Sequence, residues 1–92
     1  MEKEETKKLF QKAINTWGVE AQTTMLFEEI GELTAAMAQY IRGRKNESDV
    51  ITELADVSIM VEQIALIFGY EKYEEEKDKK LIRLKERLKK YE

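Results

Sequence analysis

Apolar residues recur at intervals of three and four positions along most of the chain, which is the spacing of one buried face of an α-helix. The spacing predicts four helices, roughly over 4–17, 20–42, 49–68 and 71–91. Gly18, Gly43 and Gly69 stand at the ends of the first three, where glycine commonly terminates a helix. The pattern predicts an all-α protein whose residues 1–92 form a single domain.

The second and third predicted helices carry the longest apolar stripes. These stripes comprise Leu26, Ile30, Leu33, Met37 and Tyr40, and then Val50, Leu54, Val57, Val61, Ile64 and Phe68. Because only the turn at 43–48 separates the two helices, we expect an antiparallel hairpin with both stripes in its core. Asn46 or Ser48 is the expected N-cap of the third helix.

The third helix has a second apolar stripe nearly opposite the first, formed by Ala55, Ile59 and Leu66. A helix that is apolar on two sides is usually buried on two sides. A chain of 92 residues buries only a modest core by itself. The first helix, the last helix or another subunit can cover this second side, and we expect a subunit interface over at least part of it, in a four-helix protomer whose bundle is completed by oligomerisation.

Acidic residues interrupt the apolar stripes in a matching way. Around the helix axis, Glu29 and Glu32 lie about 60° and 120° to one flank of Leu26. Glu53 and Asp56 lie at the same two angles from Val50 in the third helix. In an antiparallel hairpin, the four carboxylates would face one another along the edge of the core.

These four acids have no basic neighbours in the sequence. No Lys or Arg occurs between Lys12 and Arg42, or between Lys45 and Lys72, so the usual helix-neighbour cations are missing. Either protonation or a bound cation must relieve the repulsion among them. The alternative to such a cluster is that the four acids form a solvated flank of two surface helices.

The chemistry of the predicted ligands narrows the choice of cation. The chain contains no histidine and no cysteine, so only oxygen ligands are available. An all-oxygen set favours a hard divalent ion, here Mg²⁺ with Mn²⁺ as a substitute. Because Mg²⁺ usually binds a few carboxylates together with substrate phosphates, the predicted partner is a small molecule that carries phosphate.

The charge is distributed unevenly. The segment Lys77–Lys90 has eight basic and two acidic residues, so the rest of a chain of net charge -3 carries -9. An acidic protein of this kind is a poor candidate for nucleic-acid binding, although its basic helix can hold a small anion. No apolar stretch is long enough to span a bilayer and the N-terminus lacks a signal-peptide core, so we expect a cytoplasmic protein with no membrane partner.

The segment "EEIGEL" at 28–33, followed by "ELADV" at 53–57, resembles the EExxE and ExxD signature of the MazG-like, all-α nucleoside triphosphate pyrophosphohydrolase superfamily. The resemblance extends roughly from Trp17 to Leu88. It implies Mg²⁺-dependent hydrolysis of an NTP or dNTP to the monophosphate and pyrophosphate. It also implies a homodimer or homotetramer in which sites are completed between subunits.

The resemblance assigns roles to particular residues. Carried over by position, the metal ligands are Glu29, Glu32, Glu53 and Asp56. Glu28, the first acid of EExxE, lies on a different helical face and is the candidate further ligand or catalytic base. Because there is no histidine, the base must be a carboxylate or a water whose pKa the ion lowers.

Basic residues supply candidates for phosphate binding. They are Lys79, Lys80, Arg83 and Arg87 in the last helix and Arg42, Arg44 and Lys45 in the turn. The alternative interpretation is a solvated basic face on the last helix and favourable cations at a helix C-terminus.

Nucleobase contacts are predicted on the flank that carries the acids. Trp17 is a candidate to stack on a base, and Gln22, which projects to the same side as Glu29, is a candidate to hydrogen-bond one. Trp17 also continues the apolar stripe of the first helix, which favours a core position equally. Met25 and Met60 either line the same pocket or simply pack.

Two other functions remain open. Phosphoribosyl-ATP pyrophosphohydrolase has a similar motif and length, but "GEL" after the paired glutamates looks more like the MazG branch. The chain also lacks the histidine expected after the ExxD segment of that enzyme. The third possibility is a non-catalytic helical interaction module, with the last helix as a coiled-coil arm and the acids as surface charge.

Overall fold

The computed structural model describes all residues 1–92 and contains only helices. The elements are α1 (Lys3–Trp17), α2 (Val19–Ile41), α3 (Glu47–Phe68), α4 (Tyr70–Leu88) and a short 3₁₀ turn, η1 (Lys89–Tyr91). The predicted all-α class and the four helices are confirmed, with helix ends that move by up to three residues. None of the four helices combines the length and the apolar character needed to cross a membrane.

Single glycines form two of the three connections between the helices. Gly18 joins α1 to α2 and Gly69 joins α3 to α4, with φ angles of 93° and 127°. Residues with a Cβ rarely adopt such angles, so glycine permits a sharp change of direction at each joint. These two torsions set the directions of the outer helices.

The α2–α3 connection uses a capping box. The Asn46 side chain accepts a hydrogen bond from the Asp49 backbone N–H at 3.1 Å, and the Asp49 carboxylate accepts one from the Asn46 N–H at 3.0 Å. This confirms Asn46 as the N-cap of α3. Such a cap stabilises a helix start by about 1 kcal/mol.

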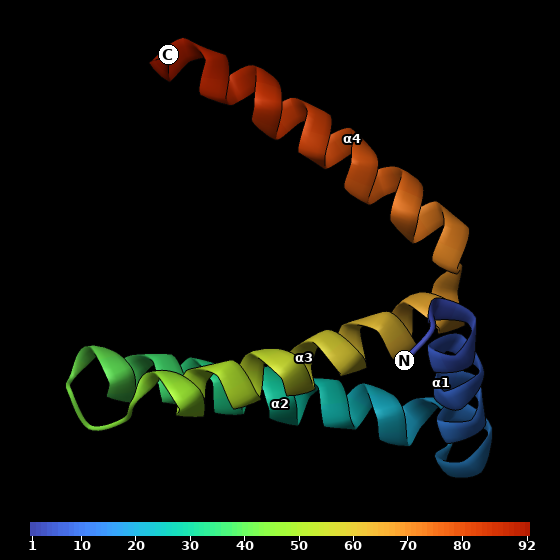
Figure 1. The fold of residues 1–92 in the computed structure, drawn as a ribbon. Helices are drawn as coiled ribbons and strands as arrows, with labels where there is room; N and C mark the ends of the chain where they lie inside the picture. The colour runs from blue at the N-terminus through green and yellow to red at the C-terminus, as the bar shows by residue number, and fades with distance from the viewer.

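The central unit is the pair α2 and α3, which lie side by side from the turn at 42–46 (Figure 1). α1 crosses the pair at the end opposite that turn (Figure 1). α4 leaves α3 at Gly69 and projects away from the pair (Figure 1). The Cα radius of gyration is 16.1 Å, against about 12 Å for a compact domain of this length, because α4 stands apart.

Few side chains of the chain are buried. The buried hydrophobic residues are Phe10, Ile14, Ala36, Met60 and Ala65. Nineteen large hydrophobic residues, by contrast, are exposed. A large exposed apolar surface usually marks an interface.

The expectation that the long stripes of α2 and α3 form the hairpin core is met only in part. Leu26 and Leu33 are half-buried, but Ile30, Leu54 and Phe68 are 44%, 50% and 81% exposed.

In α2 the two buried residues, Gln22 and Ala36, lie about 40° and 80° from the stripe centre toward the acidic flank. In α3 the buried Met60 and Gln63 lie about 80° and 140° to that flank, and Ala65 lies about 60° to the other flank. The seam therefore contains polar residues, and part of each stripe stays exposed.

The second stripe of α3 is covered only partly. Ile59 is 44% exposed and lines a groove with Leu9, Ala13 and Trp17 of α1. α1 therefore lies along part of this side, while Ala55 stays exposed.

Candidate metal centre

Three carboxylates from two helices meet at the seam between α2 and α3. Glu53 and Asp56 are three residues apart, which puts both on one face of α3. Packing of α2 adds Glu29, and one carboxylate oxygen of each residue lies within 4.8 Å of the other two. All three side chains are half-buried. Three of the four predicted ligands are thus together.

The other two glutamates of the EExxE segment lie at or outside the rim. Glu32 is exposed, but it lines the same cavity as Glu53, and its charge raises the pKa of the Glu53 carboxyl. Glu28 is exposed and lies outside the group of three carboxylates. The structure therefore brings Glu32 to the edge of the cluster and leaves Glu28 on a different face, as its position in the helix predicted.

The environment makes ionisation of two carboxyls unfavourable. Burial is the main cause that raises the pKa of Glu29, and the charges of Glu32 and Asp56 raise it further. The pKa of Glu53 is raised by burial and by the same two acids, while Lys45 acts weakly in the other direction. A cation close to these two carboxyl groups would stabilise their ionised form at neutral pH.

Two oxygen atoms in the cluster have no partner. Glu29 Oε2 and Glu53 Oε2 are buried and accept no hydrogen bond. Buried carboxylate oxygens are nearly always paired, because losing hydration without compensation is costly.

No salt bridge compensates the cluster. The four salt bridges of the chain are Lys3–Glu74, Lys7–Glu4, Lys79–Glu76 and Lys89–Glu86. The donor set is entirely carboxylate oxygen, with two of those oxygens free to accept a cation. These residues fit a hard divalent ion such as Mg²⁺ or Mn²⁺ better than they fit a solvated surface flank.

A polar cavity of about 260 Å³ adjoins the carboxylates. Its lining residues are Glu32, Ala35, Ala36, Lys45, Asp49, Thr52 and Glu53. Lys45 is therefore the member of the predicted basic turn that reaches the site, whereas Arg42 and Arg44 do not line the cavity. An ammonium group beside a carboxylate cluster can bind an anionic group that also contacts the metal.

An apolar pocket of about 420 Å³ lies farther along the α2–α3 seam, toward α1. It is lined by Trp17, Ala21, Gln22, Met25, Met60 and Gln63. Met25 and Met60 are each one helical turn from a cluster acid, Glu29 and Asp56 respectively. The pocket and the carboxylates therefore belong to one continuous stretch of the seam.

Trp17 is not a core residue. Its side chain is 66% exposed and borders this pocket, so the interpretation of Trp17 as part of the α1 core stripe is wrong. α1 ends at Trp17, and the turn at Gly18 places the indole at the end of the packed face. The two methionines line the same pocket.

Gln63 is a site residue that the sequence analysis missed. Gln22 Nε2 donates a hydrogen bond of 2.6 Å to Gln63 Oε1, and both side chains are buried. The only sequence signal was an amide within the apolar run "MVEQIALIF" at 60–68. Its pairing with a residue 41 positions away could not be read from that run.

The basic residues of α4 are not at the site. Lys79, Lys80, Arg83 and Arg87 are exposed and line neither cavity beside the seam. Lys79 instead pairs with Glu76 at 3.3 Å. The joint at Gly69 directs α4 away from the carboxylates of the same chain (Figure 1), so the contact of these residues with the phosphates stays a prediction.

The resemblance to the MazG-like superfamily stays a prediction that rests on the EExxE and ExxD residues. The geometry described above is independent of that resemblance. Comparisons of the chain with protein-family models, curated protein sequences and solved structures found no match.

Proposed function

We propose that this protein is a Mg²⁺-dependent nucleoside triphosphate pyrophosphohydrolase, which cleaves an NTP or dNTP to the monophosphate and pyrophosphate. The observation that carries the proposal is the group Glu29, Glu53 and Asp56, with two buried carboxylate oxygens that lack a partner. The resemblance of "EEIGEL" and "ELADV" to the MazG-like signature supports the same activity.

The proposed metal ligands are Glu29, Glu53 and Asp56, with Glu32 at the open edge of the cluster. When bound, Mg²⁺ would neutralise charge on the phosphates and orient them for attack by water. In the adjoining cavity, the Lys45 ammonium donates hydrogen bonds to a phosphate oxygen. The phosphate chain therefore lies between the turn and the carboxylates.

The apolar pocket is the proposed site of the nucleobase. The exposed Trp17 indole offers a flat surface for stacking, and Met25 and Met60 line the pocket. Because Gln22 donates to Gln63, the Gln22 carbonyl oxygen and the Gln63 amide N–H groups remain to contact the edge of the base. Gln63 Nε2 has only a weak contact with Met60 Sδ at 3.9 Å.

A carboxylate must accept the proton of the attacking water, because the chain has no histidine. Glu28 is the candidate from the resemblance. Glu32 is an exposed carboxylate whose charge raises the pKa of both Glu29 and Glu53. Glu28→Gln and Glu32→Gln variants, assayed at saturating Mg²⁺, distinguish them: replacing the base removes the fall in rate at low pH, which is the acidic limb of the pH–rate profile.

We also propose that the protein assembles as a homodimer or homotetramer. The nineteen exposed large hydrophobic residues support association, as does the small number of buried ones.

The test of the activity is release of pyrophosphate from a panel of standard and modified triphosphates with Mg²⁺, with phosphoribosyl-ATP included. We expect turnover of at least one triphosphate and a loss of about 100-fold or more in Glu53→Gln, since removing a ligand removes both metal and substrate. Glu75→Gln, which changes one acid of the pair Glu75 and Asp78 on exposed α4, is the matched control and should keep full activity.

Three other results would redirect the assignment. Activity on phosphoribosyl-ATP alone would favour the histidine-biosynthesis enzyme. Release from no compound at high protein concentration, with no effect of Mg²⁺ on melting, would leave the non-catalytic interaction module. Full activity of Glu53→Gln would place the reaction elsewhere.

A further inference from the structure

One side of the α2–α3 pair is apolar and uncovered. We call this side the open apolar face and define it by Phe27, Ile30, Met37, Leu54 and Phe68, all of which are exposed. Around each helix they lie between the centre of the apolar stripe and the flank away from the carboxylates, and in two antiparallel helices such flanks share one side of the pair. The face is therefore a different surface from the candidate metal centre.

A second apolar surface runs along the outer part of α4. Leu81, Leu84, Leu88 and Tyr91 form a stripe in which each side chain is at least half exposed. At about 100° per residue, Leu84 and Tyr91 lie within about 20° of Tyr73 around the helix axis. Tyr73 borders an apolar cavity of about 390 Å³ at the base of α4, together with Phe68.

The α4 stripe and the open apolar face therefore lie toward the same side of the molecule, but they do not contact each other within one chain. The α4 stripe continues the side on which α4 meets the pair, and α4 then diverges from the pair (Figure 1). Exposure of both surfaces means that no part of the same chain covers them. We call the segment 77–91 the arm.

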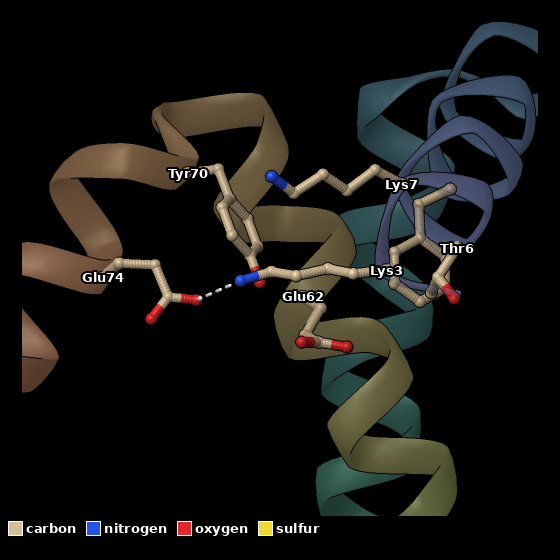
Figure 2. A pocket seen from close by; sticks show the side chains of 7 residues that line it. Lys3, Thr6, Lys7, Glu62, Tyr70 and Glu74 are labelled. Atoms are coloured by element: carbon tan, nitrogen blue, oxygen red, sulfur yellow. Dashed lines mark ion pairs between the residues drawn. The ribbon is translucent and has the colours of Figure 1, made fainter. Parts of the chain in front are cut away.

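Contacts between the first turn of α4 and α1 keep α4 pointing away from the α2–α3 pair. Lys7 Nζ lies 4.3 Å from the centre of the Tyr70 ring, and Lys3 Nζ lies 5.6 Å from it. Lys3 also approaches Glu74 at 4.0 Å (Figure 2). Cation–π contacts and this ion pair tie the first turn of α4 to α1. Together with the one-residue joint at Gly69, they disfavour closure of the arm on its own α2–α3 pair.

Net charge favours an arm on an α2–α3 pair over an arm on a second arm. The segment 77–90 has eight basic and two acidic residues, a net charge of +6. The segment 19–68, which contains α2 and α3, has nine acidic and three basic residues, a net charge of -6. Pairing of two arms would bring like charges together, whereas an arm on an α2–α3 pair brings opposite charges together.

We propose that the arm docks on a second copy of this chain, with its stripe on the open apolar face of the partner's α2–α3 pair, and that the contact is reciprocal. This specifies the assembly proposed above but does not depend on the hydrolase activity. A 15-residue helix is about 22 Å long and about 10 Å wide, so each docked arm removes roughly 450 Å² from solvent. Two arms approach the ~1,000 Å² that a specific interface requires, which favours reciprocal docking over a single contact.

The first test measures association of the full chain by sedimentation at several concentrations. The double variant Leu84→Gln with Leu88→Gln should raise the dissociation constant by about tenfold or more. Ile82→Gln is the matched control, because Ile82 is 62% exposed but lies on the opposite side of α4, and it should change the constant less than about twofold. A wild-type chain that stays monomeric, or a double variant that associates normally, would overturn the proposal.

The second test identifies the surface that receives the arm. Since the chain has no cysteine, single cysteines report contacts without background. Chains with Leu88→Cys are mixed with chains of different mass that carry Ile30→Cys, Met37→Cys or Leu54→Cys, and the mixtures are mildly oxidised.

We expect a mixed disulfide with at least one of the three positions. Cross-linking of Leu88→Cys only to itself would indicate arm-to-arm pairing and contradict the proposal. A disulfide within one chain that carries both cysteines, formed at every dilution, would indicate closure on the same protomer and would contradict it as well. Neither test uses catalysis, so failure here is distinguishable from failure of the proposed activity.

Discussion

Glu29 and Glu53 each keep one buried oxygen without a hydrogen-bond partner, and their carboxyls face other acids. Buried carboxylate oxygens without partners lower the stability of a fold, unless a bound ligand supplies the missing interactions. At the scale of single residues, the properties of this protein therefore depend on what neutralises these two groups.

The first prediction concerns the metal. Mg²⁺ or Mn²⁺ should raise the melting temperature of the wild-type chain at pH 7, because the ion binds the folded state and not the unfolded one. Glu29→Gln should raise the melting temperature of the metal-free chain and remove most of the response to metal. Circular dichroism melts with EDTA and with each ion measure this, with Glu75→Gln as the control. A wild-type melt that is indifferent to both ions would count against the site.

The second prediction concerns pH. The pKa of Glu29 and of Glu53 is raised above the ordinary value of 4.5. At pH values between the ordinary and the raised pKa, the folded state therefore binds more protons than the unfolded state. The contribution of the two carboxyl groups to the free energy of unfolding is fully present below pH 4.5 and is lost as pH rises through the raised pKa. The melting temperature of metal-free Glu29→Gln relative to wild type should therefore increase from pH 4.5 to pH 7. A constant difference across that range would contradict the raised pKa.

The third prediction concerns the buried amide pair. Gln63→Leu leaves the Gln22 amide without its 2.6 Å partner and should destabilise the fold by about 1–3 kcal/mol. The double change of Gln22→Leu and Gln63→Leu removes both polar groups and should recover part of that loss. Denaturant titrations of the double-mutant cycle measure the coupling, and strictly additive effects would indicate that the hydrogen bond contributes nothing. If the pocket binds the base, Gln63→Leu should also raise KM more than it lowers kcat.

At the scale of elements, glycine joints control the directions of α2 and α4. Gly69 has a φ of 127°, yet a Cβ built there would meet only Lys72 side-chain atoms at 3.9 Å or more. The requirement for glycine is therefore conformational and does not come from crowding.

The fourth prediction compares two glycines. Gly69→Ala should destabilise the protein by about 1–3 kcal/mol and weaken association, because the strained torsion redirects α4. Gly31→Ala is the control: Gly31 is inside α2 with nothing within 4 Å of an added Cβ, so this change should stabilise by about 0.5–1 kcal/mol. Urea unfolding of both variants tests this. A neutral Gly69→Ala would mean that α4 does not need this backbone conformation.

At the scale of the whole molecule, the protomer is an acidic helical pair with a basic arm that stands away from it (Figure 1). With five buried hydrophobic residues, the isolated protomer has little core to stabilise it. Folding should therefore be coupled to association.

The fifth prediction follows from this coupling. The melting temperature should rise with protein concentration, and the rise should shrink in high salt, because opposite charges of the arm and the helical pair are then screened. Melts over a 100-fold range of concentration at low and high salt measure both effects. A melting temperature independent of concentration would indicate a self-sufficient monomer.

Much of the fold was predictable because its causes are local. The helical spacing, the glycine stops and the Asn46 cap act over a few residues and correctly predicted four helices. The spacing of Glu53 and Asp56 likewise required that they share a face. The sequence has no basic residues on the helical turns next to these acids, and none of the four salt bridges involves them.

The rest depended on tertiary structure. The rotation of α2 and α3 about their axes decided that the acids lie in the seam and that Ile30 and Phe68 stay exposed. The same packing joined Gln22 to Gln63 and left Trp17 at the edge of a pocket.

The torsion at Gly69 kept Arg83 and Arg87 away from the carboxylates. By itself, the sequence determined which segments are helical and which chemical groups each helix carries, because periodicity and capping are properties of neighbouring residues. Only the tertiary structure decided which of those groups meet. Helix rotation and a single glycine torsion are settled by contacts between residues that are far apart in the chain.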